Sequence, residues 1–160
     1  MTRSELLIDL FNVNAWVLKK QTDGLTHDDS LLQLPFRGNC LNWVLGHIVA
    51  GRSSILGLLG DSPIWSEEEQ APYKRGSEPI TCDKNVHSLE ELLNDFDRSQ
   101  TLLVAALEHI PQEKLEKIIE TFRGEKSLGD HVAFLQWHEA YHIGQLELLR
   151  QLAGKDDAVV

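Results

Sequence analysis

The closing segment of the chain, residues 127–154, reads SLGDHVAFLQWHEAYHIGQLELLRQLAG and has a helical period. Ser127, with Asp130 in the capping-box position, marks the start of this helix, and Gly154 is a typical C-terminal cap. The segment therefore predicts a helix with one face turned toward the interior of the protein. The positions on that face recur in steps of three and four and are Leu128, His131, Leu135, His138, His142, Gln145 and Leu149.

Two long helices are predicted in the first part of the chain. The spacing of Thr2 and Glu5 matches a capping box, so the first helix is expected to begin at Thr2 and to end near Gly24. The second is expected over about residues 41–59, where Asn39 can cap it, and its apolar content is typical of a central helix.

A third long helix begins at another capping box, formed by Ser88 and Glu91, and Pro111 ends it. After it, residues 112–120 predict a short amphipathic helix, and residues 121–125 predict a turn. The last long helix, described above, follows that turn.

The connection between the second and third helices, residues 60–87, contains Pro63, Pro72 and Pro79 and is expected to lack regular structure. The chain has no alternating apolar and polar runs of the kind that form strands. We therefore expect an all-α protein, an antiparallel four-helix bundle with one long crossover between helices two and three. Because the composition does not shift along the chain, residues 1–160 are expected to form a single domain.

The charge and the cysteines narrow the choice of partners and compartment. With 15 basic and 25 acidic residues the formal net charge is -10, which repels nucleic acid and anionic membranes. The N-terminal residues show no signal peptide, and Cys40 and Cys82 have no CxxC spacing and are expected to be reduced. We therefore expect a cytoplasmic protein that acts on a small molecule.

A metal site is predicted from the pair His138 and His142. Four residues apart on a helix, the two imidazoles share one face and can bind a single ion. Inside an apolar seam each imidazole needs a partner, which a metal supplies to both; a hydrogen-bonded histidine pair is the alternative. His47, on the inner face of the second helix, is the candidate third ligand, although alone it would fit a hydrogen-bonded core histidine.

The other histidines are not expected to bind the metal. His27 and His87 lie in predicted connections and His109 at the end of the third helix, so all three are expected at the surface. His131 precedes His138 by two turns, about 10 Å along the helix axis. It is therefore expected beside the ligands or at the rim of a pocket.

Residues 138–142 also match the HExxH pattern of zinc peptidases, with Glu139 as the general base. That chemistry needs another ligand downstream, but only 18 residues follow His142 and none is a histidine. We therefore interpret Glu139 as an ordinary acid on the surface of the helix and reject peptidase activity.

Two regions, NWVLGHI at residues 42–48 and HEAYHIGQL at residues 138–146, resemble the paired signatures of the DinB-like superfamily. The resemblance extends over nearly the whole chain. It implies an up-down-down-up bundle with a three-histidine site, His47, His138 and His142, for zinc, nickel or a similar ion. It also implies a homodimer, since dimers are frequent in the family.

Characterised branches of that family include bacillithiol S-transferases and mycothiol-dependent maleylpyruvate isomerase, so the resemblance implies a low-molecular-weight thiol as cosubstrate. A metal that binds a thiol lowers its pKa, and the thiolate can attack an electrophilic small molecule. A hydrolase with metal-bound water uses the same ligands, and a non-catalytic metal-binding bundle is the third hypothesis.

Residues beyond the ligands have open roles, and the sequence identifies no catalytic residue. Tyr141 and Gln145 can line the pocket or pack in the bundle, and Arg52 can meet an anionic thiol or pair with an acidic neighbour. Substrate selection is expected in residues 60–87 and 121–129.

Overall fold

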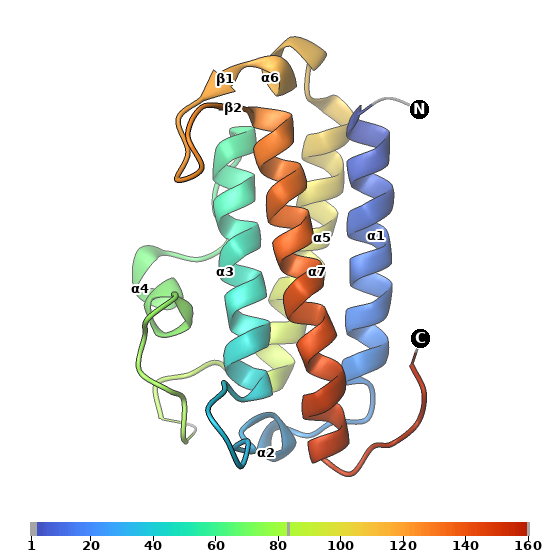
Figure 1. Ribbon diagram of the computed structural model, residues 1–160, viewed down its shortest axis with the longest axis vertical. Coiled ribbons are helices and arrows are strands. Elements are labelled where there is room, and N and C mark those ends of the chain that lie inside the picture. The colour runs from blue at the N-terminus through green and yellow to red at the C-terminus, as the bar shows by residue number, and fades with distance from the viewer. Residues whose placement is uncertain (1–2, 83, 160) are drawn as a thin grey trace.

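The computed structural model describes residues 3–82 and 84–159, and four long helices lie side by side in it (Figure 1). This confirms the predicted all-α four-helix bundle. The long helices are α1 (Arg3–Thr22), α3 (Leu41–Leu59), α5 (Leu89–His109) and α7 (Leu128–Leu152). The short elements are α2 (His27–Ser30), α4 (Glu67–Gln70), the 3-10 helix η1 (Ala71–Tyr73), α6 (Gln112–Glu116), β1 (Ile118–Ile119) and β2 (Lys126–Ser127).

The long helices have the up-down-down-up order that the family resemblance implies. Figure 1 shows α1 and α7 descending and α3 and α5 ascending. Contacts between α1 and α7 agree with this parallel pairing. Asn14 bonds to Glu139 near the middle of both helices, and Arg150 donates to the carbonyl of Gln21 near their C-terminal ends. Within the described residues, no helix is long and apolar enough to cross a membrane.

The ends of the elements confirm some sequence predictions and correct others. The capping box of Ser88 and Glu91 is present. Cys40, not the predicted Asn39, precedes α3, and its side chain makes no capping bond. The predicted cap at Thr2 lies outside the described residues. The long connection contains α4 and η1, and β1 and β2 pair around the turn near Gly124, although neither structure was expected.

The core consists of two apolar clusters stacked along the bundle axis. The cluster at one end includes Leu18, Leu45 and Phe96, and the cluster at the other end includes Phe11 and Leu56. All five side chains are fully buried. Between these clusters lies a layer of buried polar side chains, to which all four long helices contribute.

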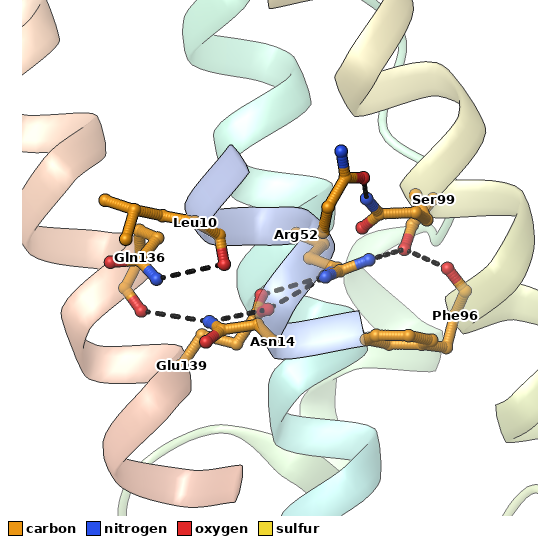
Figure 2. Close-up of polar contacts among 9 residues, drawn as sticks. Leu10, Asn14, Arg52, Phe96, Ser99, Gln136 and Glu139 are labelled. Carbon is orange, nitrogen blue, oxygen red and sulfur yellow. Dashed lines mark hydrogen bonds and ion pairs between the residues drawn. The ribbon is translucent and has the colours of Figure 1, made fainter. Parts of the chain in front are cut away.

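At the centre of this polar layer, Arg52 of α3 forms an ion pair with Glu139 of α7 (Figure 2). Two guanidinium nitrogens donate to the two carboxylate oxygens, each at 2.8 Å. Asn14 of α1 donates to Glu139 at 3.2 Å, and Arg52 donates to Ser99 of α5 at 3.3 Å. The guanidinium also lies 3.8 Å from the ring centroid of Phe96. Each of the three guanidinium nitrogens and both carboxylate oxygens therefore has a hydrogen-bond partner in the protein.

Glu139 was expected on the helix surface, and that prediction is wrong because its side chain is only 4% exposed. Pairing with an acidic neighbour, one of the two roles considered for Arg52, is the one observed. The most buried stripe of α7 is displaced by about one residue from the predicted one, so His138 and His142 lie at its margin and are half-buried. The buried positions along the middle of α7 include Val132, Gln136, Glu139, Ile143 and Leu146.

Removal of one member of the ion pair should cost more stability than removal of both. Glu139→Leu leaves a buried, unpaired guanidinium and should lower the free energy of unfolding by about 3–5 kcal/mol. In the double variant Arg52→Met/Glu139→Leu most of that loss should be recovered. Urea unfolding followed by circular dichroism measures both values.

The exposed pair of Lys19 and Asp97 provides the control, because both side chains are more than half exposed. Lys19→Met should cost less than about 1 kcal/mol. If Glu139→Leu proves no more destabilising than Lys19→Met, the buried ion pair contributes no more to the stability of the bundle than an exposed one.

Candidate metal centre

The structure brings together the three histidines selected from the sequence. His47 comes from α3, and His138 and His142 come from α7. One ring nitrogen from each side chain can be chosen so that all three lie within 4.8 Å of one another. The Nε2 atoms of His138 and His142 are 3.1 Å apart. The three rings therefore converge on one point in the groove between α3 and α7.

Hydrogen bonds at the far nitrogens orient two of these rings. Nδ1 of His47 lies 2.7 Å from the carbonyl oxygen of Tyr73, and Nδ1 of His142 lies 2.8 Å from Oε1 of Gln145. Both oxygens are acceptors, so each Nδ1 carries the hydrogen and donates. Each Nε2 then keeps its lone pair, which is the form of histidine that binds a metal.

The partial burial of the three rings favours their neutral form. Burial is the largest cause that lowers the pKa of His47 and His138, and it lowers the pKa of His142 to about 4. Neutral imidazoles need not lose a proton before they bind a cation. At neutral pH the three side chains are therefore ready to act as ligands.

The distance between the two donors of α7 fits a small divalent cation. Ligand nitrogens of a tetrahedral Zn²⁺ lie roughly 3.3 Å apart, because each is about 2.0–2.1 Å from the ion. The pair of His138 and His142 is already close to that spacing at 3.1 Å. A hollow of about 20 Å³ adjoins the three rings and extends to Ile55 and Leu135. Three imidazoles leave a coordination position for another molecule, as in catalytic sites.

The orientation of His47 depends on the crossover between α3 and α5. Tyr73 of η1 is fully buried against α3 at Gly46, where an added Cβ would lie 2.2 Å from the tyrosine ring. Only glycine allows this approach, and the approach places the Tyr73 carbonyl beside His47. This contact was not expected from the sequence, although a glycine inside a helix is itself a signal of close packing.

The remaining histidines differ in part from expectation. His109 is exposed, as predicted. His27 and His87 are half-buried, so their surface assignment is wrong: Nδ1 of His27 accepts from the Leu89 backbone amide, and His87 stacks on Trp65 with ring centroids 4.6 Å apart. His131 is buried near Phe122 and Phe134 and lies outside the three-histidine group.

The residues around the three histidines include Glu139, Gln145 and Tyr141, whose roles the sequence left open or misjudged. Both carboxylate oxygens of Glu139 bond to Arg52, so Glu139 is not free to act as the general base of a zinc peptidase. Gln145 holds the ring of His142, a more specific role than lining a pocket. Tyr141 is 57% exposed, and its ring centroid lies 5.3 Å from that of His142.

Comparisons with known proteins agree with this architecture. The model of the DinB superfamily matches residues 18–146, which include all three histidines. The solved structure described as a conserved protein of a locus from Enterococcus faecalis is similar over 96% of this chain and 98% of that chain, with a TM-score of 0.76 and 17% identity. At that identity the likeness shows the fold alone. No curated protein matches the sequence.

Gly46→Ala should weaken metal binding without unfolding the bundle. The added methyl group displaces Tyr73 and withdraws its carbonyl from His47, and loss of such a partner typically weakens metal affinity by about 10–100-fold. Competition with a chromophoric chelator measures the affinity.

Gly57→Ala is the matched control, because it lies in the same helix and no atom lies within 4 Å of its added Cβ. Its metal affinity should equal that of the unmodified protein. Equal affinity in Gly46→Ala would show that the Tyr73 carbonyl does not support the site.

Proposed function

The chain belongs to the DinB superfamily, and from that premise we propose that it is a metal-dependent enzyme with His47, His138 and His142 as ligands of one divalent cation, zinc or nickel. The convergence of three ring nitrogens within 4.8 Å carries the proposal. Imidazole ligands suit both metals. The similarity to the Enterococcus faecalis protein supports the fold and does not bear on the reaction.

The proposed reaction transfers a low-molecular-weight thiol to an electrophilic small molecule. Sulfur forms a bond to the electrophilic carbon, the leaving group departs with its bonding electrons, and the thiol proton passes to solvent. A divalent cation bound here supplies Lewis acidity, which lowers the pKa of a coordinated thiol toward neutral pH. Because the three histidines are neutral, they leave the positive charge of such a cation uncompensated.

The surrounding residues hold the ligands for this chemistry. The Tyr73 carbonyl and Gln145 fix the rings of His47 and His142. The indole of Trp43 stacks on His47 with ring centroids 4.8 Å apart and donates to Ser77 at 2.9 Å. These contacts orient the rings of His47 and His142 before any metal binds. In keeping with the family resemblance, we also propose a cytoplasmic homodimer.

Metal content tests the site before a substrate is known. Protein purified without a polyhistidine tag and loaded with Zn²⁺ or Ni²⁺ should retain about one ion per chain after gel filtration. His47→Ala and His142→Ala should retain much less, while His109→Ala, which changes an exposed histidine, should retain as much as the unmodified protein. Elemental analysis gives the stoichiometry. Equal metal content in all four proteins would rule out the proposed ligands.

Turnover distinguishes the proposed enzyme from its alternatives. With monochlorobimane and a panel of thiols, the loaded protein should form conjugates at a rate that falls to background in His142→Ala. Hydrolysis of activated esters without added thiol would instead indicate a hydrolase. A protein that binds metal but turns over neither substrate would be a binding bundle.

A further inference from the structure

A cavity of about 330 Å³ adjoins the candidate metal centre and is not explained by the fold. It lies between residues 34–39, which precede α3, and the half of α7 that follows Tyr141. His142 lines both this cavity and the hollow beside the three histidines, so the two spaces share a ligand. The volume is within the range of small-molecule binding sites.

The walls of the cavity are mostly apolar, and several of the large apolar side chains that form them are exposed to solvent. Phe36, Tyr141 and Leu148 are 65%, 57% and 60% exposed, and all three line this cavity. Trp43 forms another part of the wall, and its indole stacks on the ring of His47. Large apolar side chains gathered in one exposed concave region are typical of a ligand site.

The charge of the lining contrasts with that of the whole protein. The chain carries a formal net charge of -10, yet the cavity lining contains Arg37 and no aspartate or glutamate. Arg37 is exposed, and none of the ion pairs among the described residues involves it. A guanidinium that is not already neutralised attracts a carboxylate or a similar group and can bind it through two hydrogen bonds.

We infer that this cavity binds the electrophilic substrate, a small molecule with an apolar, preferably aromatic, body and one anionic group. The body lies against Phe36, Tyr141 and Leu148, the anionic group is held by Arg37, and the reactive atom faces His142. The inference rests on the proposed function for the role of this molecule as the substrate. It places substrate selection in residues 34–39 and α7, and not in residues 60–87 and 121–129, where it was expected from the sequence.

Two fluorescent probes with similar bodies and different charges test the inference by direct binding. The first is 8-anilinonaphthalene-1-sulfonate, which is anionic, and the second is N-phenyl-1-naphthylamine, which is neutral. Both should bind the full-length protein. Arg37→Ala should weaken binding of the sulfonate by roughly tenfold and leave the neutral probe unaffected. Arg98→Ala, which removes an exposed arginine of α5, should leave the binding of both probes unchanged.

The apolar wall is tested with a second matched pair of variants. Leu148→Glu puts a charge into the wall and should weaken the binding of both probes by at least about tenfold. Val13→Glu puts the same charge on α1, where Val13 is 57% exposed and does not line the cavity. This variant should bind both probes as tightly as the unmodified protein. Because Leu148 is more than half exposed, Leu148→Glu should remain folded, which circular dichroism verifies.

The outcomes separate this inference from the proposed function. Equal sulfonate binding by Arg37→Ala and the unmodified protein would overturn the role of Arg37, and unchanged binding of the neutral probe by Leu148→Glu would overturn the cavity as the site. His138→Ala should lose metal but keep probe binding. Probe binding without any metal binding would refute the metal site alone, whereas metal binding without probe binding would refute this inference alone.

Discussion

The ion pair between Arg52 and Glu139 constrains the position of α3 relative to α7 more strongly than any apolar contact. Removing two charges from water costs several kcal/mol for each ion, and only nearly complete hydrogen bonding offsets that cost. Here the two bonds of 2.8 Å and the contacts with Asn14 and Ser99 provide it. A shift of α7 by one residue would break these bonds, so the pair fixes the axial register of the helices.

The same register aligns the candidate metal centre. Glu139 directly follows His138 and lies three residues before His142 on α7, while His47 precedes Arg52 by five residues on α3. Since α3 and α7 run in opposite directions, pairing at Arg52 places His47 opposite the two histidines of α7. Apolar side chains can slide past one another at low cost, but a bidentate pair cannot. The buried charges thus position three histidines to which they make no hydrogen bond.

The sequence predicted the elements better than the contacts between them. Helical periodicity, capping residues and Pro111 located the four long helices, and the spacing of His138 and His142 indicated two of the three histidines that the structure brings together. Periodicity resolves a helix face only to about one residue, or 100° of rotation, so Glu139 was placed on the surface. Its partner Arg52 is 87 positions away, and the sequence pattern gave no means of pairing the two. Tyr73 and His47 are 26 positions apart, and a sequence pattern likewise does not show that residues so far apart are in contact.

Because the buried ion pair and the three histidines are different residues, the two sets are expected to tolerate substitution differently during evolution. A change at Arg52 or Glu139 alone leaves an unpaired charge in the core. Substitutions at these two positions are therefore expected to occur together in descendants of this sequence. The histidines are half-buried and make none of the hydrogen bonds that hold Arg52 and Glu139, so we expect that each can be replaced singly while the helices remain in register. Relatives that retain the scaffold after losing the metal ligands are therefore accessible by single mutational steps, and shared architecture alone is weak evidence of shared chemistry.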